Sequence, residues 1–271
     1  MVAKLIKHEW LRTRYLLGLI FAGGTFLVLV GSGLMLFKDT LISIVAGVSM
    51  FLGFAIMVLG PTAWLVIEHY QSSFGRQGYL THTLPTTGPK IFWTKLSYGS
   101  LVLLVNLVWG AVLGVLAMYS IEYANGNDPD WSLVPNLLQE LVEITPPWLL
   151  ALMIIWLLLS PAMSLITFYF PVAFGSETRM QKLGFGGPVL VYVIYYAVSQ
   201  ALALISLILL PVAIFFVDGQ LTISTYNFFE AMASENGLDG VPIGVLMLQF
   251  VISVGLAWRT HVSWSKKIAL R

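Results

Sequence analysis

The chain has 271 residues, of which 58% are hydrophobic and 10% are charged, and its net charge is +1. A soluble domain carries about 25% charged residues, so this composition indicates a membrane protein. The sequence contains no cysteine, which excludes disulfides and thiolate metal sites. The net charge gives no indication of nucleic-acid binding, because the positive residues follow a membrane face and form no single patch.

Residues 1–14 have the pattern of a short basic amphipathic helix. At 100° per residue, two faces separate: an apolar one (Val2, Leu5, Ile6, Trp10, Thr13) and a basic one (Lys4, Lys7, Arg14). Such a helix is suited to lie in the inner headgroup layer; the alternative is a positive topology anchor alone. Glu9 interrupts the apolar face, so we expect it to pair with Arg12, with Arg14 or with another part of the protein.

Six apolar stretches follow, each long enough to cross a bilayer, since a spanning helix needs about 20 mostly apolar residues. We place the spans at residues 15–37, 41–67, 96–120, 148–174, 188–217 and 241–260. The first stretch is too long for a cleaved signal peptide and lacks a small-residue cleavage site. Pro61, Pro161 and Pro211 lie inside spans and each removes a backbone donor, so bends are expected there. The sequence thus predicts an all-α membrane protein with a six-span domain over 15–271.

The charges divide between the two sides that six spans define. All but one of the fourteen Lys and Arg residues fall on one side, in the segments 4–14, 76–95, 179–182 and 259–271. Lys38 is the exception, and most acidic residues fall on the other side. Because short cytoplasmic loops are enriched in Lys and Arg, we expect both termini to be cytoplasmic.

Two longer segments on the acidic side carry signals of their own. In 121–147, a turn cluster precedes a short amphipathic helix with leucines on one face (Leu133, Leu137, Leu138, Leu141). The segment 218–240 holds Tyr226, Phe228 and Phe229, and we expect these aromatic rings at the outer membrane interface or re-entering it.

In this placement, no Asp, Glu, Lys, Arg or His lies deep in a span. Proton-coupled carriers commonly use such residues as relays, so their absence argues against an ion-coupled carrier. It also argues against an intramembrane metalloprotease. The four histidines have no metal-ligand spacing, and no phosphate-binding loop is present.

Neutral polar residues within the spans have two interpretations: they bond neighbouring helices, or they line a substrate path. On the fifth span, tyrosines recur at helical spacing, which fits either a cavity for an amphipathic molecule or an ordinary helix contact. The candidates for a substrate path are Asn106, Tyr192, Tyr196 and Gln200.

The segment 68–95 is polar, yet it is rich in aromatic and apolar residues that should pack on the protein's own helices or on a partner. It contains Phe74-Gly75-x-x-Gly78-Tyr79-Leu80-x-x-Thr83-Leu84-Pro85, and Lys95 opens the third span. This pattern resembles the loop of ABC-2 type permeases, in the branch common in Gram-positive bacteria. Two further stretches are similar to that branch: Phe174-Gly175 through Lys182-Leu183-Gly184, and Leu5-Ile6-Lys7-x-Glu9.

The resemblance implies the membrane subunit of a bacterial ABC exporter, embedded in the cell membrane. Two permeases, identical or related, would form a twelve-span unit among the membrane lipids. Each would dock on a separate ATP-binding cassette subunit that holds ATP and Mg, so this chain would hold no cofactor and catalyse nothing. The implied cargo is a drug, an antimicrobial peptide or a lipid-like molecule. Thr86-Thr87-Gly88 and the long acidic outer loops depart from the commonest pattern, which leaves the substrate class open.

The resemblance also assigns the partner contacts. The loop after the second span would be the coupling helix, seated in a groove of the ATPase, with docking residues Phe74, Gly75, Arg76, Gly78, Tyr79 and Leu80. A lesser second contact would come from Glu177, Arg179 and Lys182.

The alternative is a secondary transporter or a membrane-embedded enzyme without an ATPase partner. Either would need ionisable or nucleophilic groups at depth. Ser160, Ser164 and Ser199 are the available nucleophiles, and no histidine base lies in a span. A protein that works by binding alone is a third interpretation, and it can share the permease fold.

Overall fold

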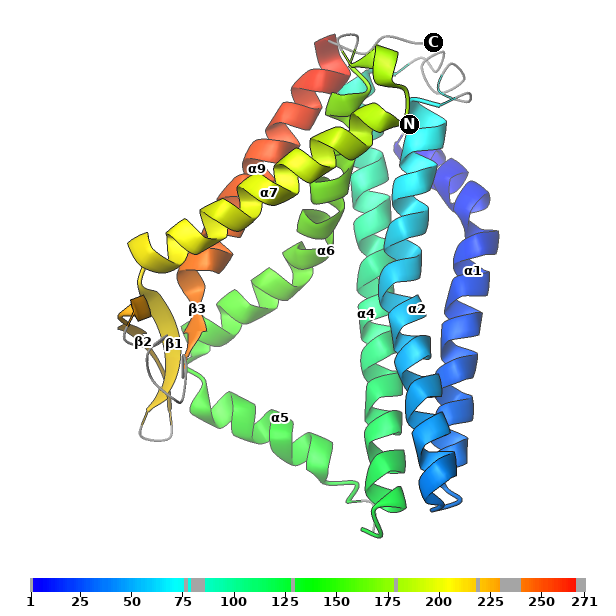
Figure 1. Cartoon of the computed structure of the whole chain (residues 1–271), viewed down its shortest axis with the longest axis vertical. Helices are drawn as coiled ribbons and strands as arrows, with labels where there is room; N and C mark the ends of the chain where they lie inside the picture. Colours follow the sequence, from blue (N-terminus) through cyan, green and yellow to red (C-terminus); the bar gives the residue numbers. More distant parts are fainter. Residues whose placement is uncertain are drawn as a thin grey trace. The chain divides into compact units, whose positions relative to one another are not determined.

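The computed structural model describes residues 2–75, 78, 86–127, 130–177, 180–217, 220–229 and 240–266. The chain forms two compact units, Met1–Leu138 (unit 1) and Gln139–Arg271 (unit 2). Six helices, of 23 to 37 residues each, are long and apolar enough to cross a membrane (Figure 1). The protein is therefore a multi-pass membrane protein.

The elements follow one another as expected for a chain of long helices, with one small sheet. Unit 1 contains α1 (Val2–Met35), α2 (Thr40–Ser73), α4 (Gly88–Ala124) and the first half of α5 (Leu133–Ile144). Unit 2 contains α6 (Pro147–Gly175), the short 3-10 helix η1 (Gln181–Leu183), α7 (Gly186–Leu209), β1 (Val212–Val217), β2 (Gln220–Thr225), β3 (Val241–Pro242) and α9 (Ile243–Lys266).

In unit 1, α1 and α2 approach each other closely where small residues face one another. A Cβ on Gly53 would lie 2.8 Å from the Gly24 carbonyl oxygen and 2.7 Å from the Val28 side chain. A Cβ on Gly31 would lie 2.7 Å from the Ala46 carbonyl oxygen. Close packing of this kind is a main source of helix association in lipid, whose tails are as apolar as leucine.

A proline inside α2 explains one bond between α2 and α4. The helix continues through Pro61, which lacks the N–H that would bond the carbonyl four residues earlier. That carbonyl belongs to Met57, and Asn106 Nδ2 of α4 donates to it at 2.7 Å. The side chain therefore replaces the missing backbone donor, as a helix in lipid requires.

The proline in the middle of α6 follows the same rule. The helix continues through Pro161, and the carbonyl left without a backbone donor is that of Leu157. Ser160 Oγ donates to it at 2.9 Å. At both prolines a side chain thus replaces the lost backbone hydrogen bond, while the predicted bends stay predictions.

The fifth span is shorter than expected, because α7 ends at Leu209 and does not reach residue 217. A residue before proline is disfavoured in the helical region, and Leu210, which precedes Pro211, has φ −119° and ψ 68°. Tyr226 Oη donates at 3.2 Å to the carbonyl of Leu207, four residues before this proline.

After Pro211 the chain forms a three-stranded antiparallel sheet, so the all-α prediction is wrong in this segment. The strand order is β2-β1-β3; Val212 pairs with Thr225 at one end of the β1–β2 ladder, and Ile214 pairs with Val241 in β3. The β1 sequence Val-Ala-Ile-Phe-Phe-Val is rich in β-branched and aromatic residues. Such residues favour a strand once the helix has been stopped by proline.

The N-terminal segment 1–14 also differs from the expectation of a separate element. α1 runs without a break from Val2 to Met35, because residues 10–17 contain neither glycine nor proline. The expected apolar face stays exposed at Val2, Ile6 and Trp10. The residues of this stretch that contact α2 and α4 are polar: Glu9, Arg12 and Thr13.

Candidate functional site

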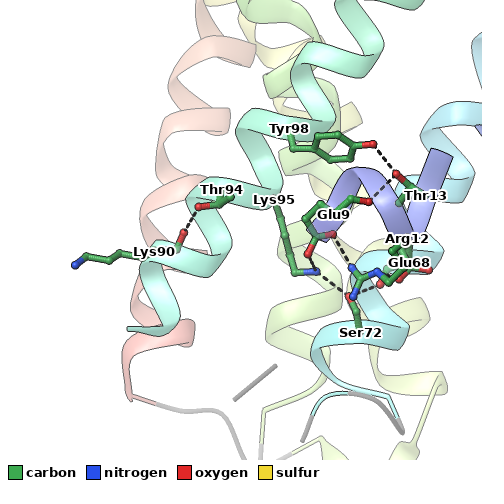
Figure 2. A network of polar contacts seen from close by, with 9 residues as sticks. All are labelled: Glu9, Arg12, Thr13, Glu68, Ser72, Lys90, Thr94, Lys95 and Tyr98. Carbon is green, nitrogen blue, oxygen red and sulfur yellow. Dashed lines mark hydrogen bonds and ion pairs between the residues drawn. The ribbon is translucent and has the colours of Figure 1, made fainter. Parts of the chain in front are cut away.

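Three helices of unit 1 bring two acidic and two basic side chains together at one end of the bundle (Figure 2). We call these four residues the charge network: Glu9 and Arg12 from α1, Glu68 from α2 and Lys95 from α4. Arg12 Nη2 lies 2.6 Å from Glu9 Oε2, and Arg12 Nε contacts Glu68 Oε1. Lys95 Nζ lies 3.0 Å from Glu9 Oε1. The expected pairing of Glu9 with Arg12 is therefore confirmed, and Lys95 is a second partner.

Hydroxyl groups extend the charge network on two sides. Lys95 Nζ donates to Ser72 Oγ at 2.8 Å. Thr13 Oγ1 donates to the Glu9 backbone carbonyl at 2.9 Å and lies 2.5 Å from Tyr98 Oη. Because the single threonine hydroxyl proton is used on Glu9, the tyrosine hydroxyl is the donor of the second bond. Each of the three helices is thus bonded to the other two through side chains.

The charge network is electrically balanced and shielded from water. The exposed fraction of the side chain is 4% for Lys95, 9% for Glu68, 13% for Glu9 and 21% for Arg12. Charges in such surroundings are tolerated only when they are paired and hydrogen-bonded. Two carboxylates facing two cations provide the pairing, and removing any one of the four leaves an unbalanced charge.

The charge network lies at the two ends of the segment that joins α2 to α4. Glu68 is close to the end of α2 and Lys95 is close to the beginning of α4. These two residues are also the first and last of the segment 68–95 that the sequence singled out. The network therefore fastens together the two helix ends from which that segment emerges.

The predicted docking residues begin directly at the end of α2. The Phe74 N–H donates to the Tyr70 carbonyl at 2.9 Å, and the Gly78 N–H donates to the Gly75 carbonyl at 2.9 Å. A Cβ on Gly75 or Gly78 would lie 2.9 or 2.8 Å from a backbone oxygen of α2, so glycine allows the chain to fold closely onto the helix end. The remaining predicted docking residues, Arg76, Tyr79 and Leu80, lie outside the described residues.

The second predicted contact contains an ion pair within unit 2. Glu177 is buried, and its Oε1 lies 2.6 Å from Arg259 Nη2 of α9. The same guanidinium lies 4.6 Å from the centre of the Phe174 ring. Lys182 is exposed in η1, whereas Arg179 lies outside the described residues. The carboxylate of Glu177 is thus engaged by its own unit.

The four residues proposed for a substrate path do not form one described site. Asn106 is in unit 1 and donates to a backbone carbonyl, as an ordinary bond between helices would. The other three are on α7 of unit 2. There the Tyr192 ring stacks on Phe168 of α6 at 5.4 Å, while Tyr196 and Gln200 are exposed.

Two of the three serines considered as nucleophiles are hydrogen-bonded within their own helices. Ser160 and Ser199 each donate to a carbonyl of their own helix, at 2.9 and 2.8 Å. Within the described ranges, no group of three or more His, Asp or Glu side chains is placed to hold a metal ion.

Reasoning from the sequence missed the charge network as a unit. It placed Glu68 and Lys95 just outside the second and third spans and treated them as loop charges. The signal that was available is that Glu9 lies on the face of the N-terminal helix that the other residues make apolar, since a lone acid there requires a buried cation.

Comparison of the chain with protein-family models, with curated proteins and with solved structures finds no match to any of them.

Proposed function

We propose that this chain is the membrane subunit of an ATP-driven ABC exporter. In this role, the segment between α2 and α4 would seat on a separate ATP-binding cassette subunit. A second permease, identical or related, would complete the translocation path. The proposal applies the likeness to ABC-2 type permeases to a protein whose six candidate spans match the expected number.

The observation that best supports the proposal is the charge network at the two ends of this segment. A loop that only connects two helices needs no buried ion pairs at its ends. Here Glu68 and Lys95 hold the ends of α2 and α4 to α1 through Arg12 and Glu9. A force applied to the segment would therefore reach three helices together instead of bending one.

The mechanism requires that the partner binds differently in two states. ATP binding would draw together the two ATPase subunits and the segments seated on them. A rigid connection to the helix ends would convert that movement into a change of the path between the two permeases, provided that the contacts differ between the states. ATP and Mg would belong to the partner, and the cargo would be a drug, a peptide or a lipid-like molecule.

Isolation of the native complex in mild detergent tests this proposal most directly. We expect a P-loop ATPase to co-purify with the chain, and we expect the chain alone to hydrolyse no ATP. Tyr79→Ala and Leu80→Asp should abolish co-purification and transport without lowering the melting temperature. Thr86→Ala, in the same segment but outside the predicted docking residues, is the matched control and should retain both.

Two results would contradict the proposal. One is hydrolysis of ATP by the isolated chain. The other is unchanged ATPase co-purification and transport in both docking variants.

One observation favours an ion-coupled carrier as the second candidate. The charge network places four ionisable side chains among helices long enough to span a membrane, where such groups are often functional. Its two acidic and two basic side chains neutralise one another. A stable contact between helices needs that balance, whereas a proton relay needs a group that changes its charge. Transport driven by a proton gradient in liposomes that contain this chain alone would favour the carrier.

A further inference from the structure

A second feature, independent of the proposed ATPase contact, is the amphipathic helix α5. Its twelve residues divide into two faces at 100° per residue. The apolar face holds all of its leucine, valine and isoleucine side chains (Leu133, Val134, Leu137, Leu138, Leu141, Val142, Ile144). The polar face holds Asn136, Gln139, Glu140 and Glu143. A division this complete predicts that the two faces meet two different environments.

The apolar face of α5 is not covered by the described part of the protein. No residue of the helix is buried. The exposed fraction is 53% for Leu137, 58% for Leu138 and 61% for Val142. Exposed apolar side chains that lie next to one another mark a surface that contacts another molecule or a membrane.

The covalent link to α6 places one end of α5 at the level of the lipid headgroups. Only two residues separate Ile144 from Pro147, so these two residues lie within about 11 Å of each other. α6 has 29 residues and is therefore about 44 Å long. That length matches a bilayer of about 40–45 Å including its headgroups. Trp148, in the first turn of α6, is exposed, as aromatic residues in the interfacial belt are.

The other end of α5 is held to the end of α4. The Trp131 ring lies 4.7 Å from the Tyr119 ring, and Tyr119 Oη donates to the Trp131 carbonyl at 3.4 Å. Asp130 Oδ1 accepts bonds from the N–H and the hydroxyl of Ser132, directly before the helix. These bonds hold the pKa of the Asp130 carboxyl below its usual value. The aromatic pair and the turn fix where α5 begins, next to the end of α4.

We infer that α5 lies flat in the headgroup layer at the membrane surface where α4 ends and α6 begins, with its leucine face in lipid. Because α5 is linked by short segments to spanning helices at both ends, it is already held beside the lipid. Its uncovered apolar face can enter the headgroup layer without a longer loop. Glu140 and Glu143 then face water, so the preferred surface is zwitterionic, because anionic headgroups would repel them.

The experiment uses the full chain in phosphatidylcholine nanodiscs. Because the sequence has no cysteine, a single introduced cysteine carries an environment-sensitive fluorophore without ambiguity. Leu137→Cys and Leu141→Cys report the apolar face, and Asn136→Cys and Glu143→Cys are matched controls on the polar face of the same helix. Each is quenched in turn by iodide in water and by nitroxide-labelled lipid.

We expect iodide to quench the apolar-face labels at least threefold less than the polar-face labels, and nitroxide lipid to do the reverse. Equal iodide quenching on both faces would overturn the inference, because α5 would then stand in water. Apolar-face labels protected from both quenchers would also overturn it, because a second copy of the chain or another protein would then cover the face. Leu138→Cys and Gln139→Cys form a second pair if one variant folds poorly, as judged by size-exclusion elution.

Discussion

The two units of the protein hold their helix ends together in different ways. In unit 1, four charged side chains from three helices form one network together with Ser72, Thr13 and Tyr98. In the described part of unit 2, the corresponding ion pair joins Glu177 to Arg259. Both arrangements lie beside a segment that the sequence places on the basic side of the membrane.

This difference indicates how firmly each segment is attached. In unit 1, the segment between α2 and α4 begins and ends at helices that side-chain bonds join to each other and to α1. In unit 2 the chain turns tightly between α6 and α7, where a Cβ on Gly187 would lie 2.3 Å from the Gly175 carbonyl oxygen. At these helix ends, unit 1 therefore relies on charge, whereas unit 2 relies mainly on the close approach of backbone.

Lys95→Met should cause the largest loss. It removes one of two cations that balance Glu9 and Glu68, and breaking a buried ion pair from one side costs about 3–5 kcal/mol. The measurement is the free energy of unfolding in mixed lipid–detergent micelles, followed by tryptophan fluorescence. Lys90→Met, on an exposed residue of the same helix, is the matched control and should change it by less than about 0.5 kcal/mol.

A double variant tests whether charge balance is the cause. Glu9→Gln together with Lys95→Met leaves one acid and one base, so it should recover at least about 1 kcal/mol relative to Lys95→Met alone. Equal stability of the Lys95→Met and Lys90→Met proteins would show that the charge network does not hold unit 1 together.

In unit 2, two adjacent glycines provide a sharper test. Gly187→Ala would place a methyl group against the Gly175 carbonyl, and the required backbone shift should cost about 1–3 kcal/mol. Gly186→Ala meets its nearest neighbour, Leu183 Cβ, at 4.0 Å and should be neutral or stabilising, since alanine is the better helix former. Melting temperatures that fall equally for both would argue against the close approach at residue 187.

Asn106→Leu tests the replacement of a lost backbone bond. It leaves the Met57 carbonyl without a donor, because Pro61 has no N–H, and this should cost about 1–2 kcal/mol. Pro61→Ala supplies that N–H, so Asn106→Leu should cost at least about 0.5 kcal/mol less in that background. Equal costs in the two backgrounds, measured by the same unfolding assay, would mean that Asn106 has another role, such as lining a substrate path.

Much of the helical framework could be predicted from the sequence, because long apolar runs leave little choice of structure in lipid. The ends of the helices were harder to predict. Pro211 ended α7 early because its effect reaches the residue before it, and hydropathy alone does not register that.

Lys38, the one basic residue on the acidic side, lies with its Nζ 3.9 Å from the centre of the Tyr123 ring. This cation–π contact joins residues far apart in sequence, and no local pattern predicts it.

The candidate site shows the same limit. Phe74 and the two glycines after α2 were singled out from their motif, since glycine at fixed spacing is visible locally, and their docking role stays a prediction. The charge network was not found, because its members come from three segments and only folding brings them together. The best local signal for such a network is a lone charged residue on an otherwise apolar helix face near a helix end, as Glu9 is.

Arg259→Met should cause the smallest of the four losses. It removes the cation paired with Glu177, and this guanidinium is 23% exposed against 4% for Lys95, so water screens its pair more strongly. We expect a loss of about 1 kcal/mol, against several for Lys95→Met. Glu177→Gln keeps a hydrogen-bond acceptor for the guanidinium and should cost less still. If Arg259→Met were as damaging as Lys95→Met, the contact of the guanidinium with Phe174 would have to contribute strongly, and the contrast between a charge-held unit 1 and a backbone-held unit 2 would fail.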